Sequence, residues 1–268
     1  MMPGFEFIIY YILLGSFVGV AAGLMGIGGG GIIVPVLTTL FLMQGVPHNE
    51  VVHLALGTSM ATIVITSFSS LRAHHKRGGV IWDVVKMMAP GILLGAFLAT
   101  FLASILSSFY LAIFFSIFMA YVSIQMFINK KPKPSRKLLS SLGQFISGSI
   151  IGLVSALVSI GGGSLSVPYL IWQNVELRKA IGTSAAIGFP LAISGTIGYI
   201  INGWGHTDMQ HLVVGFVSLP AFFIIAFCSY FMAPVGVKLT HILPVEITKK
   251  IFALLLITLS IKMLSSFI

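Results

Sequence analysis

Charged residues are scarce in this sequence. Only 8% of the 268 residues are Asp, Glu, Lys or Arg, whereas a soluble domain carries about 25%. So few charges cannot cover a globular surface, and the mean hydropathy is high, at +1.06. The chain must therefore use lipid as part of its solvent. Its length leaves room for about eight to ten apolar segments of membrane-spanning size.

Cysteine and catalytic motifs are also nearly absent. Cys228 is the only cysteine, which excludes an internal disulfide and a cysteine-based metal cluster. The sequence has no HExxH motif, no paired intramembrane carboxylates and no Ser/His arrangement. We therefore predict that the protein is not an enzyme and has no catalytic residue, metal or cofactor. The first residues lack the basic region of a secretory signal, so we expect the first apolar run to be retained.

The net charge of +9 does not indicate a nucleic-acid partner. Lys and Arg lie in short polar stretches between apolar runs, which is the positive-inside pattern of membrane proteins rather than a basic binding face. The expected surroundings are a lipid bilayer, namely the cell inner (plasma) membrane, which the chain crosses several times.

Consecutive glycines interrupt two long apolar runs. Residues 7–43 and 138–172 are each too long for one straight helical crossing of a hydrocarbon core of about 30 Å. Glycines cluster near the middle of each run, at residues 26–31 and 159–164. Because each glycine weakens a helix by about 1 kcal/mol relative to alanine, each run is predicted to be a helix, a break and a second helix.

The two halves of the chain share an ordered pattern of glycine, proline and hydroxyl residues. The matched pairs are Gly15 with Gly148, Gly19 with Gly152, Gly28–Gly30 with Gly161–Gly163, Pro35 with Pro168, Gly57-Thr58-Ser59 with Gly182-Thr183-Ser184, and Pro90 with Pro220. Ordered matches of this kind predict a duplication. The expected units are residues 1–129 (first membrane repeat), 130–137 (a basic cytoplasmic linker) and 138–268 (second membrane repeat).

Loop charges predict the topology. Basic residues mark the stretches 72–79, 130–137 and 235–250 as cytoplasmic, whereas residues 104–108 and 202–211 contain no Lys or Arg. These assignments agree only if each glycine-broken segment returns to the side from which it entered. The predicted fold is therefore all-α, with about eight membrane segments in two inverted repeats, each a broken hairpin plus three transmembrane helices. Both termini are predicted to be extracytoplasmic.

The glycine breaks are the candidate binding site. Residues Gly28, Gly29, Gly30 and Gly31 precede a helix expected to begin near Ile32, and Gly161, Gly162, Gly163 and Ser164 repeat the pattern in the second half. Pro35 and Pro168 support the helix breaks. Free amides at a helix N-terminus favour an anion, so two converging tips could bind one without a buried cation. Glycines also serve close helix packing, which is the preferred interpretation of Gly15, Gly19 and Gly23.

Hydroxyl and imidazole groups give weaker signals. Thr58, Ser59, Thr183 and Ser184 are candidate substrate ligands, although such hydroxyls often bond a carbonyl one turn back. His74 and His75 are expected to be solvated in a basic loop. His53 is expected at the outer interface, where solvation is the default and proton coupling an alternative.

The two glycine motifs resemble those of the TauE/SafE sulfite exporter family, also called the toluene sulfonate uptake permeases. They read GLMGIGGGGIIVP at residues 23–35 and LVSIGGGSLSVP at residues 157–168, and the similarity extends over essentially the whole chain. The resemblance implies a permease of about eight segments for sulfur-containing anions such as sulfite, sulfoacetate or other organosulfonates. The second motif departs from the first by having Ser159 and Ser164 where the first has glycine.

The leading hypothesis is a secondary transporter that exports sulfite or an organosulfonate through a midplane site. An inside-negative potential drives an anion outward, by about 2.3 kcal/mol per charge per 100 mV. The alternatives are proton-coupled uptake of an organic sulfonate or carboxylate, a channel, and a scaffold without transport activity. The sequence leaves open a homodimer, a hairpin that spans the membrane fully, and the choice between rocking and elevator mechanisms.

Overall fold

The chain folds into a bundle of ten helices among the residues that the structure describes. These are residues 4–25, 28–128, 138–205, 212–239, 242–243 and 245–267 of a computed structural model. The predicted linker 130–137 lies outside them. The helices are α1 (Phe5–Met25), α2 (Gly30–Met43), α3 (Val51–His75), α4 (Trp82–Ile105), α5 (Ser108–Ile128), α6 (Ser141–Leu157), α7 (Gly163–Trp172), α8 (Leu177–Gly203), α9 (Leu219–Leu239) and α10 (Val245–Ser265).

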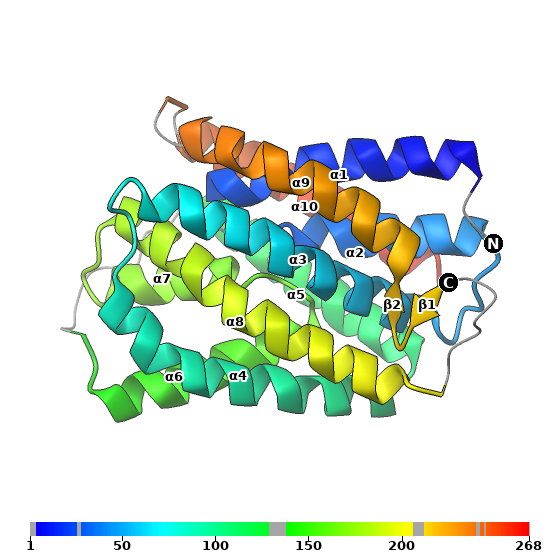
Figure 1. Cartoon of the computed structure of the whole chain (residues 1–268), viewed down its shortest axis with the longest axis horizontal. Coiled ribbons are helices and arrows are strands. Elements are labelled where there is room, and N and C mark those ends of the chain that lie inside the picture. Colours follow the sequence, from blue (N-terminus) through cyan, green and yellow to red (C-terminus); the bar gives the residue numbers. More distant parts are fainter. Residues whose placement is uncertain are drawn as a thin grey trace.

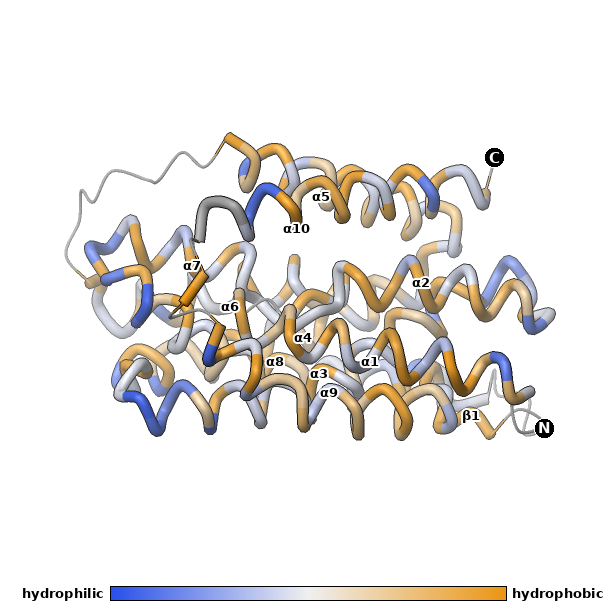
Figure 2. The backbone as a smooth tube through the Cα atoms, turned by 90° about the horizontal axis from the view of Figure 1, so that it is seen from above, coloured by the Kyte–Doolittle hydropathy of each residue, from blue (hydrophilic) through white to orange (hydrophobic). Residues whose placement is uncertain are grey.

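Six of these helices are long and apolar enough to cross a membrane: α1, α3, α4, α5, α8 and α9. Two shorter apolar helices, α2 and α6, accompany them. Hydrophilic residues gather mainly at the two ends of the bundle, with hydrophobic residues along the helices between them (Figure 2). Large apolar side chains such as Leu13, Ile117 and Phe227 are exposed on the outer helices. The predicted all-α architecture is thereby confirmed, and it is consistent with a multi-pass membrane protein.

The two chain ends lie at the same end of the bundle (Figure 1). We call this the terminal end, and it also holds the turns at residues 44–50 and 106–107. The opposite end, with the turns at residues 76–81 and 173–176, is called the basic end. From the terminal end, α1 runs toward the basic end, and after the glycine break α2 returns to the terminal end. In the second half, α6 and α7 make the same excursion from the basic end (Figure 1).

Helices α3 and α8 form the middle of the bundle. They pack against each other, α9 and α1 lie on one side of them, and α4 and α6 lie on the other (Figure 1). Helices α5 and α10 pack together in a separate layer. Of the candidate membrane spans, α3 is the most buried. The centre of the bundle is therefore formed mainly by α3 and α8.

Small residues allow the outer pairs to approach closely. A Cβ atom added at Gly19 in α1 would lie 2.7 Å from the carbonyl oxygen of Ser229 in α9, and one at Gly152 in α6 would lie 2.6 Å from that of Ile92 in α4. The same type of contact therefore joins α1 to α9 and α6 to α4. Such approaches are typical of membrane helices with small interfacial residues.

Glutamine side chains close the base of both hairpins. Gln44, the C-cap of α2, donates from Nε2 to the Tyr11 hydroxyl of α1 at 2.7 Å. Gln173, the C-cap of α7, accepts at Oε1 from Gln144 Nε2 of α6 at 2.8 Å. Each bond thus ties the second helix of a hairpin to the first.

A short β-hairpin precedes α9, and its last residue makes a hydrogen bond that resembles one made just before α4. Strands β1 (Val213–Val214) and β2 (Val217–Ser218) pair antiparallel. The Ser218 amide donates a hydrogen bond to Thr58 of α3. The Ile81 amide, just before α4, donates a similar bond to Thr183 of α8. Ile81 and Ser218 thus make equivalent bonds, at the starts of α4 and α9. The predicted match of Pro90 with Pro220 is wrong, because Pro90 lies in the third turn of α4 whereas Pro220 is the second residue of α9.

We predict that Gly19→Leu destabilises the protein by about 2 kcal/mol or more, the cost of overpacking a tight contact. Thermal unfolding in detergent should therefore show a clearly lower Tm. Ser104→Leu is the matched control, since it adds similar bulk at an exposed position of α4 whose hydroxyl bonds only its own helix, through the Phe101 carbonyl. An unchanged Tm for Gly19→Leu would refute the close α1–α9 packing.

Candidate functional site

Left-handed glycines form the turn of each hairpin. Gly28 and Gly29 have φ angles of 72° and 83°, and Gly162 has 81°. Side chains other than glycine rarely adopt this backbone conformation. Gly29 and Gly162 are the N-caps of α2 and α7. Helix α2 thus begins at Gly30, two residues earlier than Ile32.

A helix beginning near Ile32 would have Pro35 in its first turn, but both prolines lie deeper in their helices. Pro35 is inside α2, in its second turn, and Pro168 has the equivalent place in α7. Both lie equally far from their left-handed N-cap. Because proline lacks an N–H, each removes one hydrogen bond from the early part of its helix.

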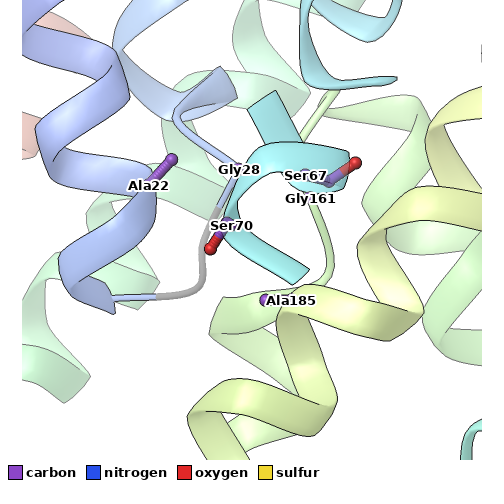
Figure 3. A pocket seen from close by; sticks show the side chains of 6 residues that line it. All are labelled: Ala22, Gly28, Ser67, Ser70, Gly161 and Ala185. Atoms are coloured by element: carbon purple, nitrogen blue, oxygen red, sulfur yellow. The ribbon is translucent and has the colours of Figure 1, made fainter. Parts of the chain in front are cut away.

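The two glycine tips touch each other in the interior. A Cβ atom added at Gly28 would lie 2.7 Å from Gly161 Cα, and one at Gly30 would collide with the carbonyl of Ser159. The close-up shows Gly28 beside Gly161 (Figure 3). The expectation that the tips converge is confirmed. Since main chain meets main chain, a side chain at either position would separate the halves.

Unpaired amides cluster at this contact. Gly161, Gly163 and Ser164 donate to no acceptor among the described residues, and the same holds for Gly28 through Gly31. The exception in the second tip is Gly162, whose amide bonds the Ile160 carbonyl at 2.7 Å. Two helix N-termini, each equivalent to about half a positive charge, therefore face one region. Such a region favours an anion.

A small cavity adjoins the contact. It has a volume of about 10 Å³ and is lined by Ala22, Gly28, Ser67, Ser70, Gly161 and Ala185 (Figure 3). A space of this size holds a single water molecule. None of the lining residues is charged, so the amides and two hydroxyls supply all the polarity. An oxyanion needs a larger space, and this conformation is therefore closed around the tips.

The predicted threonine ligands bond across the two halves. Thr58 Oγ1 of α3 accepts from the Ser218 amide at 2.9 Å, and Thr183 Oγ1 of α8 accepts from the Ile81 amide at 3.0 Å. Both threonines are fully buried. Thr58 thus joins α3 to the strand before α9, and Thr183 joins α8 to the residue before α4. Each bond links the two halves of the chain.

The neighbouring serines differ from each other. Ser184 Oγ lies 3.1 Å from Ser166 Oγ of α7, whereas Ser59 Oγ is buried without a hydrogen-bond partner. Neither residue lines the cavity between the tips. Ser164 is half-buried at the start of α7. The structure thus brings the tip glycines together but places the serines and threonines around them.

Sequence reasoning missed Ser67 and Ser70. Both are buried in α3 and both line the cavity. The signal was a group of serines inside an apolar helix, which by itself more often indicates a hydroxyl bonded to its own backbone. Ser67 does bond the Val64 carbonyl, at 3.2 Å, but Ser70 Oγ has no partner.

Two histidine predictions are wrong. His74 is not solvated, because it lies in the last turn of α3 with its side chain buried and Nε2 3.3 Å from the Gly23 carbonyl. His53 is also buried, with Nδ1 3.2 Å from Ser108 Oγ and Nε2 3.0 Å from the Ala103 carbonyl. His53 therefore ties α3 to the α4–α5 turn.

Comparisons with known proteins agree with a transporter. A Haemophilus influenzae protein named probable membrane transporter protein is 39% identical over 260 residues, covering 97% of this chain and 98% of its own. Probable membrane transporter proteins of Bacillus subtilis (YdhB) and Methanocaldococcus jannaschii are 28% and 27% identical, covering 89% and 88% of this chain and 92% and 89% of theirs. No solved structure matches the chain.

The fold and these relatives define a multi-pass membrane transporter. The family described as Sulfite exporter TauE/SafE matches residues 11–263. The chain therefore belongs to the TauE/SafE sulfite exporter family, and the resemblance of its glycine motifs is confirmed.

We predict that Thr58→Val and Thr183→Val destabilise the protein, because each leaves an amide without its acceptor. The cost should be about 1–3 kcal/mol and larger for Thr58→Val, since Ser218 is buried whereas Ile81 is partly exposed. Thermal unfolding in detergent measures the change. Thr58→Ser and Thr183→Ser keep the acceptor and should retain most of the stability. Unchanged stability of the valine variants, or an equal loss in the serine variants, would contradict this role.

Proposed function

We propose that the protein is a secondary transporter that exports a small sulfur-containing anion, sulfite or an organosulfonate such as sulfoacetate. The single observation that carries the proposal is the contact between Gly28 and Gly161, where unpaired amides of two helix N-termini meet. Neutral donors of this kind bind an oxyanion without an ion pair. The name of the family supports the choice of a sulfur oxyanion.

The proposed membrane arrangement is two inverted repeats with eight membrane segments. Residues 1–129 and 138–268 each supply a broken hairpin and three crossing helices. Three observations support it: the α1–α9 and α6–α4 contacts repeat, the glutamine at each hairpin base repeats, and the threonine bonds repeat. In such repeats the substrate site lies near the midplane, where the two tips meet.

The proposed orientation places the basic end in the cytoplasm of a cell with an inner membrane, and both termini outside. Basic side chains support it, because most of the described ones lie at that end: Arg72, Lys76, Arg77, Lys86, Arg178, Lys179, Lys238, Lys249 and Lys250. Among the described residues, only Lys262 lies near the terminal end. The positive-inside rule then gives the direction.

The charge of the substrate supports export as the proposed direction. The six residues that line the cavity include no acid or base, so the site itself supplies no proton to compensate the anion. The inside-negative potential then drives the anion outward, by about 2.3 kcal/mol per charge per 100 mV. The tips must separate during the cycle, because the cavity of about 10 Å³ holds only water.

We predict potential-dependent sulfite flux in proteoliposomes, and its loss in Gly162→Leu. The leucine would stand at the N-cap of α7 and block access to the amides beside it. Gly45→Leu is the matched control, because Gly45 has a φ angle of 83° against 81° for Gly162 and no atom within 4 Å of an added Cβ. The control should fold with the same backbone strain and still transport.

The substrate assignment fails if wild-type protein carries no sulfur oxyanion under any imposed potential. The site assignment fails if Gly162→Leu transports like the wild type. Accumulation of an organosulfonate against the potential, driven by a pH gradient, would instead indicate proton-coupled uptake.

We predict that thiol labelling places the two ends of the bundle on opposite faces of the membrane. Cys228→Ala removes the only cysteine, and Lys76→Cys or Ser107→Cys then adds one at an exposed site of the basic or terminal end. An impermeant maleimide should label Ser107→Cys in intact cells and Lys76→Cys only in inverted vesicles. The reverse pattern would overturn the orientation, and labelling of both from one face would overturn the spanning arrangement.

A further inference from the structure

One face of α3 is polar from the glycine tips to the basic end. Ile63 contacts Gly28 and Gly30 at the tips. Ser67 and Ser70 follow at the cavity, and His74 continues toward the basic end. Intervals of three and four residues place these side chains on the same side of the helix. Ser67, Ser70 and His74 are only 3%, 2% and 4% exposed, so this polar face lies inside the protein.

The corresponding face of α8 is packed against other side chains. From the tips toward the terminal end it presents Gly188, Ala192, Gly195 and Tyr199. An added Cβ at Gly195 would lie 3.1 Å from Met60 Sδ, so α3 fills the space there with a thioether side chain. Tyr199 is buried, and its hydroxyl donates to the Ala156 carbonyl at 3.1 Å.

The two faces therefore differ although their helices occupy equivalent places. The face of α3 carries hydroxyls beside the tips, whereas the face of α8 is packed by Met60 and carries a bonded tyrosine. Toward the terminal end, the tips are therefore followed by packed apolar and bonded groups. Toward the basic end, they are followed by the buried polar side chains of α3.

Ser70 is the residue of this face that lacks a partner. Its Oγ is buried, has no hydrogen bond, and adjoins the cavity beside Gly28 and Gly161. Leaving a buried hydroxyl without a partner is unfavourable. Ser69, the next residue, points elsewhere, since its hydroxyl donates to the Tyr230 carbonyl of α9 at 2.7 Å. The unsatisfied group and the water-sized cavity together indicate a site for a polar occupant.

We propose that Ser70 is a substrate-binding residue and that the face of α3 formed by Ser67, Ser70 and His74 is the pathway from the basic end to the glycine tips. The inference rests on the proposed function. A water occupies the cavity in the closed state, and an oxygen of the oxyanion takes its place when the tips open. Ser70 Oγ then donates to that oxygen while tip amides donate to the others.

The first test compares Ser70→Ala with Ser69→Ala in sulfite flux assays. Loss of one hydroxyl bond to a charged ligand should raise KM by roughly ten-fold or more, with normal amounts of folded protein. Ser69→Ala removes a hydroxyl of the same helix that faces α9, and its KM should stay at the wild-type value. A wild-type KM for Ser70→Ala, or an equal increase in both variants, would overturn the role of Ser70.

The second test does not depend on the substrate. In the Cys228→Ala background, Ser70→Cys is exposed to an impermeant, negatively charged methanethiosulfonate reagent on either face of membrane vesicles. The thiol should react from the face at which Lys76→Cys reacts, and much more slowly from the face at which Ser107→Cys reacts. Reaction from the latter face, or from neither, would overturn the pathway.

The two tests separate this inference from the proposed function. If wild-type protein carries no sulfur oxyanion but Ser70→Cys reacts only from the basic end, the substrate is wrong and the pathway stands. If wild-type flux is normal while Ser70→Ala keeps its KM and Ser70→Cys is unreactive, the transporter stands and the pathway is wrong.

Discussion

The contact between two glycine turns organises this protein. Gly28 and Gly161 approach so closely that no side chain fits between them. The glutamines tie the two helices of each hairpin together at its base, and the threonine bonds hold the central helices to the opposite half. Non-helical backbone is tolerated at membrane depth only inside protein or beside water. Here each turn is covered by the other and by α3 and α8.

Under the proposed function, the same contact lets a chain with few charges bind an anion. A buried Lys or Arg would bind more strongly, but it would cost several kcal/mol to desolvate and would hold its ligand tightly. Main-chain amides at two helix ends provide a weaker, neutral set of donors. A site of this kind suits a transporter, because the ligand must leave as readily as it enters.

Much of this arrangement could be predicted from the sequence, because consecutive glycines and ordered repeats are local signals. These signals predict the helix breaks, the convergence of the two glycine tips and the resemblance to the family. The start of α2 was misplaced because the left-handed angle at Gly29 allows a helix to begin at Gly30. The partners of Thr58 and Thr183, the burial of His53 and His74, and the unpaired Ser70 depend on contacts between distant segments. No local pattern reports such contacts.

The most direct test is an experimental structure of the protein in lipid with saturating sulfite. We expect an oxyanion held by amides of both turns, within hydrogen-bond distance of residues 28–31 and 161–164. Gly28 and Gly161 should lie further apart than in the closed state. An anion bound elsewhere by Lys or Arg side chains, with the two turns still in contact, would contradict it.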